Sequence, residues 1–287
     1  MVKFGAHAFV WTGDWTLETG NATIEKAARV GFDFLEIPLL DPSDFAAAEH
    51  RAALEHFGLG SSCSLTLPEN AHMPAQPQAA KDFLFRVFDQ MELLGSRYLT
   101  GCIGYALGVQ SGAAPTALER TQVAVTLREV ALEAHSRGIT LALEACNRYE
   151  TYMYNTLSDV RDTVLETGAP NLFVHADTYH MNIEEEGFYA PLVAAADKLD
   201  YVHMSESHRG LVGSGTVNWN EVWRGLEHAR FSGSLVLESF AAINPKLQAA
   251  TCLWRPTNVD SDTLASEGLK FLKEGAARAL GEFETRS

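Results

Sequence analysis

Four side chains that can bind a metal stand near the carboxyl ends of four consecutive apolar segments. They are Glu144, Asp177, His203 and Glu238, in segments 139–146, 172–178, 200–206 and 233–240. Carboxylates are rare in ordinary core strands, because burying an unpaired charge is costly. If the four segments are neighbouring parallel strands, three carboxylates and one imidazole meet at one opening and require a cation. Such oxygen and nitrogen donors suit Mn²⁺, Co²⁺ or Mg²⁺, so the pattern predicts a site for a divalent metal ion.

A second set of polar residues lies in the segments that follow three of these strands. Glu150, His180 and Arg209 come three to six residues after predicted metal ligands. A carboxylate accepts hydrogen bonds, a histidine donates or relays a proton, and a guanidinium holds or polarises an oxygen atom. Together the three residues indicate a small substrate that is rich in hydroxyl groups.

The elements that must position these residues alternate regularly along the chain. Eight short β-prone runs cover 2–10, 34–39, 59–65, 98–103, 139–146, 172–178, 200–206 and 233–240. Helical patterns cover 21–30, 44–57, 78–94, 115–137, 158–167, 219–229 and 263–281. Five of the helical patterns are followed by a glycine just before a strand, which suits a left-handed helix end. Eight strands that alternate with helical patterns favour an α/β fold, a (β/α)₈ TIM barrel with a parallel eight-stranded core and a C-terminal helix, as one domain over 1–287.

In a barrel of this kind the active-site loops follow the strands, so the predicted ligands share one mouth. Among the residues at the ends of the first three strands are His7, Trp11, Glu36 and Cys63. We expect His7, Trp11 and Cys63 to line a substrate pocket there, although all four residues could instead pack behind it. The glycine-rich stretch 210–215 is interpreted as a mobile cover over the substrate.

Composition excludes several classes of protein. The chain has 287 residues, with 22 Lys and Arg against 37 Asp and Glu, a formal net charge of −15. The hydrophobic share of 46% is typical of a globular protein. The excess of negative charge argues against a nucleic-acid or membrane-surface partner, because both are polyanionic. Neither a membrane-spanning run nor a signal peptide is recognised, and the four cysteines are widely spaced, so a cytoplasmic protein with reduced thiols is expected.

Several segments resemble the ketose 3-epimerases, which include the D-tagatose, D-allulose (psicose) and L-ribulose 3-epimerases of the xylose-isomerase-like barrel superfamily. The most specific are LEACNRYET at 143–151, HADTYHMNIEEE at 175–186, VHMSESHRGLVGSGTVNW at 202–219 and LESF at 237–240. GAHAFVWTG at 5–13, GFDFLEIPL at 31–39 and LWR at 253–255 extend the similarity over nearly the whole chain. The loop at 101–112 does not align confidently with the family pattern.

This resemblance implies roles for the residues already singled out. One divalent ion per subunit, often Mn²⁺ or Co²⁺ with Mg²⁺ as a further option, would be held by Glu144, Asp177, His203 and Glu238. The O1–O3 end of the sugar would be held by Glu150, His180 and Arg209. Glu144 and Glu238 would also act as the acid/base pair on opposite faces of C3, through a cis-enediolate. A free ketose as substrate and a homodimer or homotetramer are further expectations from the resemblance.

Other reactions remain open from the sequence. A hydroxypyruvate-type or other aldose–ketose isomerase would move a proton between C1 and C2, and an inosose-dehydratase-like lyase would release water. An endonuclease of the same superfamily would require more histidine ligands and a basic surface. A non-catalytic sugar-binding protein would not need the pair Glu144 and Glu238.

Overall fold

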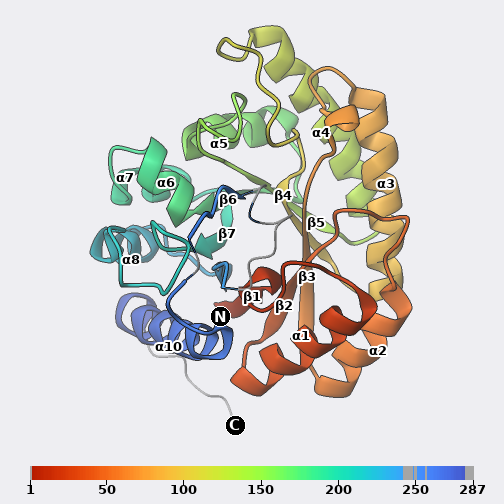
Figure 1. Ribbon diagram of the computed structural model, residues 1–287. Coiled ribbons are helices and arrows are strands. Elements are labelled where there is room, and N and C mark those ends of the chain that lie inside the picture. Colours follow the sequence, from red (N-terminus) through yellow and green to blue (C-terminus); the bar gives the residue numbers. More distant parts are fainter. Residues whose placement is uncertain (1, 242–247, 249–250, 256, 282–287) are drawn as a thin grey trace.

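Eight parallel strands close into a barrel in the computed structural model, which describes residues 2–241, 248, 251–255 and 257–281 (Figure 1). The strands follow one another around the ring in chain order, and β8 pairs with β1. They are β1 (Lys3–His7), β2 (Phe34–Pro38), β3 (Gly60–Thr66), β4 (Tyr98–Cys102), β5 (Thr140–Glu144), β6 (Leu172–Asp177), β7 (Leu199–Met204) and β8 (Ser234–Leu237). All eight predicted strands are therefore confirmed, and so is the TIM barrel.

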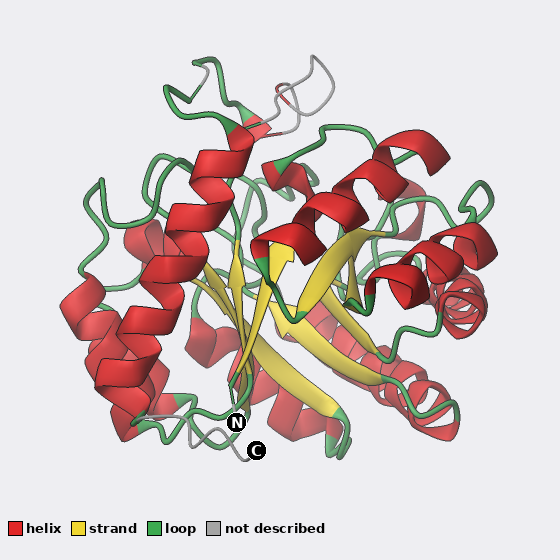
Figure 2. Cartoon of the chain, turned by 90° about the horizontal axis from the view of Figure 1, so that it is seen from below, coloured by secondary structure: helices red, strands yellow, loops and turns green. Residues whose placement is uncertain are grey.

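Helices surround the strands on the outside (Figure 2). The long ones are α1 (Leu17–Val30), α2 (Ala47–Phe57), α3 (Pro77–Leu94), α4 (Ala117–Ser136), α5 (Leu157–Thr167), α8 (Trp219–His228) and α10 (Ser261–Leu280). In the ranges that the structure describes as complete elements, the short ones are α6 (Thr178–Glu184) and α7 (Tyr189–Ala194), with 3₁₀ turns η1 (Ala8–Val10) and η2 (Glu69–Ala71). The seven predicted helical patterns match the seven long helices, and α10 is the expected C-terminal helix. The two short helices were not predicted.

Local sequence explains where the helices start and stop. Thr16, Thr116 and Thr156 each accept a hydrogen bond from the third backbone N–H of the helix that follows, and the side chain at that position bonds back. This capping box satisfies amide groups that would otherwise have no partner. Gly31 ends α1 with a φ of 95°, a left-handed conformation in which glycine has no side chain to strain.

Two layers of apolar packing hold the barrel together. Most of the core lies between the outer faces of the strands and the helices. A smaller cluster of Phe34, Ala142, Tyr201 and Val236 is separate from it. Burial of this apolar surface stabilises the fold by about 25 cal/mol for each Å² removed from water.

No helix among the described residues has both the length and the apolar character that crossing a membrane demands. The predicted irregular stretch 241–262 is described only at 241, 248, 251–255 and 257–262, so the rest of it lies outside the described residues.

Candidate active site

The four predicted metal ligands meet at the carboxyl end of the barrel. Asp177 and His203 lie side by side in the register of β6 and β7, Glu144 ends β5, and Glu238 directly follows β8. All four are buried, with relative exposures between 0% and 7%. His203 Nδ1 is 3.4 Å from Glu238 Oε1 and 3.9 Å from Glu144 Oε1. Donor atoms of Asp177, His203 and Glu238 all lie within 4.8 Å of one another.

Glu36 orients the imidazole of His203 by contacting the ring nitrogen that faces away from the other ligands. Its Nε2 lies 2.8 Å from Oε2 of Glu36, and the hydroxyl of Tyr201 donates to the same oxygen at 2.6 Å. With Nε2 bonded to this carboxylate, Nδ1 faces the cluster, and although it is buried it has no hydrogen-bond partner among the described residues. Burial would lower the pKa of His203, but the carboxylates of Glu36 and Glu238 raise it well above its ordinary value. The negative potential of the site therefore favours a proton on His203, and a bound metal ion would take the place of that proton on Nδ1.

The positive group beside these ligands is the guanidinium of Arg209. Its Nη1 donates to Asp177 Oδ2 at 2.8 Å and to Glu238 Oε2. The guanidinium lies 3.9 Å from the ring centroid of Tyr179 and 5.0 Å from that of Phe240. Arg209 also has a φ of 57°, which is unfavourable for a residue with a side chain and persists only when the surroundings enforce it. The surrounding structure thus holds Arg209 in an unfavourable backbone conformation, which fixes its guanidinium at the site.

The three carboxyl groups do not titrate alike. Burial raises the pKa of Glu144 well above its usual value, with added repulsion from Cys146, Asp177 and Glu238. Burial also raises the pKa of Asp177, to about 7, despite the attraction of Arg209. Glu238 is buried too, yet Arg209 and His203 hold its pKa well below the usual range. Burial raises the pKa of all three groups, and only at Glu238 do positive neighbours overcome it, so a cation bound beside Glu144 and Asp177 would lower their pKa values.

A second group of predicted residues forms a hydrogen-bonded chain at the mouth. Asn147 Nδ2 donates to Glu150 Oε1 at 2.7 Å and lies 2.9 Å from Nδ1 of His180. Nε2 of His180 is 3.2 Å from Nη2 of Arg209. Burial and Arg209 lower the pKa of His180 well below its ordinary value, so this imidazole is neutral. The structure therefore brings Glu150, His180 and Arg209 together, with Asn147 as a link that the sequence reasoning did not assign.

Of the remaining residues predicted to line the pocket, one lies at the site and two lie away from it. His7 lies beside the site, with Nε2 3.6 Å from Glu36 Oε1 and 3.2 Å from the Ser64 hydroxyl. Trp11 instead donates from Nε1 to Asp262 of α10 at 2.9 Å. Cys63 is fully buried and alternates along β3 with Ser64, which faces inward, so its thiol points to the helical layer. The structure brings His7 to the cluster but not Trp11 or Cys63.

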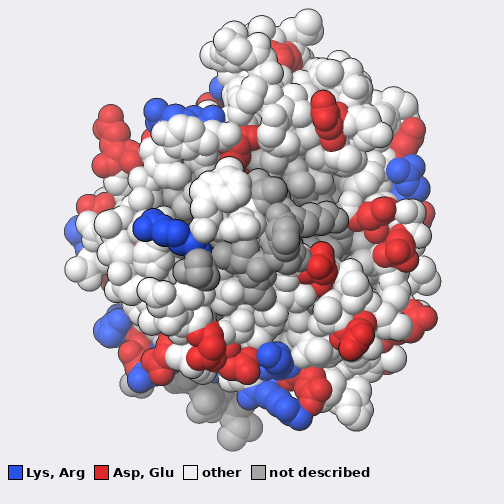
Figure 3. Space-filling model, in the orientation of Figure 1, with Lys and Arg blue, Asp and Glu red and all other residues white. Residues whose placement is uncertain are grey.

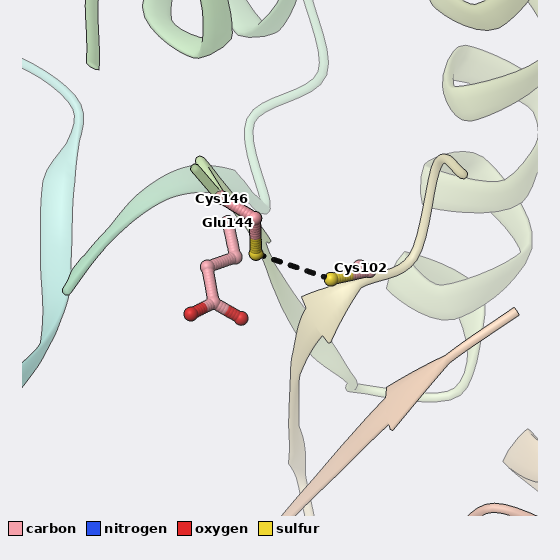
Figure 4. Close-up of side chains that lie close together, drawn as sticks. All are labelled: Cys102, Glu144 and Cys146. Atoms are coloured by element: carbon pink, nitrogen blue, oxygen red, sulfur yellow. Dashed lines mark hydrogen bonds between the residues drawn. The ribbon is translucent and has the colours of Figure 1, made fainter. Parts of the chain in front are cut away.

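Three buried groups at the mouth were not predicted. His175 Nδ1 lies 2.7 Å from the Thr100 hydroxyl and 3.7 Å from Glu144 Oε2. Cys102 and Cys146 place their sulfur atoms 3.5 Å apart beside Glu144 (Figure 4). The sequence gives no reason to single these residues out, because their spacing does not show that they face inward at the same end of the barrel.

The buried carboxylate of Glu206 accepts hydrogen bonds from several parts of the glycine-rich loop after β7. One carboxylate oxygen accepts from the N–H groups of Ser207 at 2.9 Å and Val217 at 3.1 Å. The other accepts from Gly213 N at 2.9 Å and from the indole of Trp219 at 3.0 Å. The interpretation of this loop as a mobile cover has no support from these contacts, which tie both of its ends and its middle to one buried side chain.

Comparison with known proteins places the chain in a family. Residues 24–275 match the family described as Xylose isomerase-like TIM barrel. The chain is 37% identical over 279 residues to an L-ribulose 3-epimerase of Methylomonas sp. (strain DH-1), covering 95% of this chain and 97% of that protein. It is 35% identical over 280 residues to a ketose 3-epimerase of Arthrobacter globiformis, covering 95% and 96%.

A solved structure shares the same architecture. The D-allulose 3-epimerase from Methylomonas sp. in complex with D-allulose superimposes with a TM-score of 0.91, at 36% identity, over 95% of this chain and 96% of that one. The shared barrel and the similarity over nearly the full length show that the chain belongs to the ketose 3-epimerases of the xylose isomerase-like TIM barrel family.

Proposed function

We propose that this isomerase inverts the configuration at C3 of a free ketose, of the D-tagatose, D-fructose/D-allulose or L-ribulose type. The observation that carries the proposal is the pair Glu144 and Glu238, both buried, at the end of β5 and directly after β8 at the carboxyl end of the barrel. Inverting a stereocentre by proton transfer needs a base on one face of the carbon and an acid on the other. Two carboxyl groups from separate strands of the ring supply such a pair.

The donor set at the mouth fits a divalent metal ion. When Glu144, Asp177 and Glu238 are all ionised, as metal ligation requires, Arg209 is the described side-chain cation that contacts two of them, and it does not balance all three charges. The orphaned Nδ1 of His203 completes three oxygen donors and one nitrogen donor. Such a set suits Mn²⁺ or Co²⁺, and also Mg²⁺. When bound, the ion would polarise the carbonyl and hydroxyl oxygens of the sugar and so acidify the C3 proton.

The protein's own residues carry the remaining chemistry. The depressed pKa of Glu238 keeps it a carboxylate, whereas the raised pKa of Glu144 keeps a proton available. In one direction Glu238 takes the C3 proton, and Glu144 then protonates the opposite face of the cis-enediolate. The roles reverse for the epimer. Opposite pKa shifts in two neighbouring carboxyl groups are the usual sign of an acid and a base.

The chain of Glu150, Asn147, His180 and Arg209 is suited to hold the O1–O3 end of the sugar. It presents a carboxylate acceptor, an amide, a neutral imidazole and a cation in one connected series. Such mixed donors and acceptors match vicinal hydroxyl groups better than a phosphate, which would favour backbone amides with several cations. We therefore propose a free sugar rather than a sugar phosphate.

No nucleic-acid partner is proposed. On the face drawn in Figure 3, Lys and Arg side chains are interspersed with Asp and Glu rather than gathered into one field. Because the protein has a formal net charge of −15, it would repel DNA.

We expect a homodimer or homotetramer. Light scattering after size-exclusion chromatography would measure the oligomeric state.

Product analysis tests the reaction. The protein with Mn²⁺ is incubated with D-fructose, D-tagatose or L-ribulose, and the sugars are separated by chromatography. A 3-epimer that keeps the keto group at C2 supports the proposal. An aldose would indicate an aldose–ketose isomerase, and a dehydrated product would indicate a lyase; either would overturn it.

A further inference from the structure

Two cysteines that the proposed reaction does not use face each other beside Glu144. Cys102 ends β4, and Cys146 lies two residues beyond the end of β5. Both are buried, with exposures of 3% and 1%, and their sulfur atoms are 3.5 Å apart. Figure 4 shows Glu144 and Cys146 at the end of β5, opposite the thiol of Cys102.

The two thiols are free and hydrogen-bonded to each other, and the separation of their sulfur atoms is close to the one that chelation requires. A disulfide needs about 2.05 Å between the sulfurs, which is far shorter than the separation here. Two thiolates on one tetrahedral Zn²⁺ at about 2.3 Å each lie about 3.8 Å apart, within a few tenths of an ångström of the observed distance. Small side-chain adjustments would therefore suffice to admit a metal ion between Cys102 and Cys146.

A third donor stands at the same place. One carboxylate oxygen of Glu144 and the two sulfur atoms all lie within 4.8 Å of one another. Cys146 also forms a group within 4.8 Å with Glu150 and His180. Glu150 is partly exposed, so this side of the cysteine pair leads toward the mouth and solvent.

We propose that Cys102, Cys146 and Glu144 form a second metal site, which takes a thiol-seeking divalent ion such as Zn²⁺ or Cd²⁺. On binding, the two thiols release their protons to solvent and two metal–sulfur bonds form, with no change of oxidation state. Thiolates select such soft ions, whereas the oxygen-rich set of Asp177, His203 and Glu238 does not. The two sites share Glu144, so an ion on the cysteine pair withdraws that carboxylate from the neighbouring site.

Cadmium absorbance tests the binding directly. In a Cys252→Ser background, which removes the exposed thiol, metal-free protein is titrated with Cd²⁺ while the ultraviolet thiolate-to-cadmium charge-transfer band is recorded. We expect the band to saturate at one equivalent. It is lost in Cys102→Ser and in Cys146→Ser but is retained in Cys63→Ser, the matched control for a buried thiol elsewhere in the barrel.

A cadmium NMR spectrum of the Cys252→Ser protein gives a second reading that needs no core substitution. A resonance in the range of two-sulfur coordination supports the site, and a resonance in the all-oxygen and nitrogen range overturns it. The proposal also fails if no charge-transfer band appears, or if the band survives both serine variants.

The consequence for turnover rests on the proposed function, whereas the binding does not. Cd²⁺ should inhibit the Mn²⁺-loaded Cys252→Ser enzyme, and the Cys102→Ser variant in that background should resist the inhibition. If the band is found but no protein epimerises any ketose, the proposed function fails and the metal site stands. If the protein epimerises a ketose but shows no cysteine-dependent band, the metal site fails and the proposed function stands.

Discussion

Glu144 and Glu238 are chemically alike but sit in different surroundings, and their substitution separates catalysis from stability. We expect Glu144→Gln and Glu238→Gln each to lower kcat by about 10²- to 10⁴-fold, the usual contribution of a positioned acid or base. Glutamine keeps the shape of the side chain but cannot exchange the proton. Initial rates measure the loss, and circular dichroism checks the fold. Glu166→Gln, on the exposed face of α5, is the control that should leave the rate unchanged.

Glu36 acts on the site through His203. Replacing it with Gln substitutes an amide for the carboxylate that bonds Nε2, and outer partners of this kind contribute about 10- to 100-fold to metal affinity. We therefore expect Glu36→Gln to weaken Mn²⁺ binding by that factor, as measured by calorimetry. Tyr201→Phe removes the hydroxyl bond to Glu36 and should have a smaller effect in the same direction. Equal Mn²⁺ affinity in Glu36→Gln and the parent would refute this role.

The contrast between these residues shows what the sequence could reveal. Glu144, Asp177 and Glu238 stood out because a carboxylate at the end of an apolar run is unusual. Glu36 was noticed at a strand end, but its partner is 167 residues away, and no local pattern encodes such a pairing. Asn147 lay within a recognised segment, yet only the folded loop shows that it joins Glu150 to His180.

Among the elements, the loop after β7 depends on one carboxylate. Burial alone would raise the pKa of Glu206, but hydrogen bonds from Ser207, Trp219 and other donors lower it. A depressed pKa stabilises the fold above the unfolded value of about 4.3, and the contribution is lost as the pH falls through the lower folded value. Glu206→Gln should therefore reduce the free energy of unfolding at pH 7 by about 1–3 kcal/mol.

Urea unfolding of Glu206→Gln and its parent at a series of pH values checks this expectation. The difference between the two proteins should shrink as the solution becomes more acidic than about pH 4. Glu227→Gln, on the exposed side of α8, serves as the control. A difference that is absent at pH 7, or that grows in acid, would show that Glu206 does not anchor the loop as a carboxylate.

The elements themselves were predictable to different degrees. Most of the long helices carry a periodic apolar face, as α1 does, and several have clear end signals such as Thr116 and Gly31. The helices α6 and α7 have only seven and six residues, too few for a periodic pattern to develop. Strand ends were overestimated where the segment continued past the sheet, as at Cys146, because apolar composition does not show where pairing stops.

For the whole molecule, a metal held by four strands should couple activity to stability. Exhaustive chelation is expected to abolish turnover, and added Mn²⁺ or Co²⁺ to restore it. Binding to the folded state alone should stabilise it by about 2.7 kcal/mol when the ion is a hundredfold above its Kd. Thermal unfolding with and without Mn²⁺ measures this effect, and Asp177→Asn should show a smaller shift. Undiminished turnover in protein shown to be metal-free would contradict the metal-dependent mechanism.

The closed barrel was predictable because eight repeated strand–helix units leave few alternatives. Which side chains point inward could not be derived in the same way. Cys63 was expected at the pocket, but the alternation along β3 turns it outward. Trp11 was expected there too, and its bond to Asp262 depends on where the distant helix α10 packs. Side-chain direction thus requires the register and the packing, whereas the order of elements does not.

Proton NMR in D₂O is the most direct measurement of the proposed reaction. The Mn²⁺-loaded protein is incubated separately with D-fructose, D-tagatose and L-ribulose, and exchange is followed at each carbon. We expect deuterium to enter at C3 as the 3-epimer appears, since the C3 proton passes through Glu144 or Glu238. Exchange at C1, or no exchange at either carbon in folded protein with Mn²⁺ bound, would contradict epimerisation at C3.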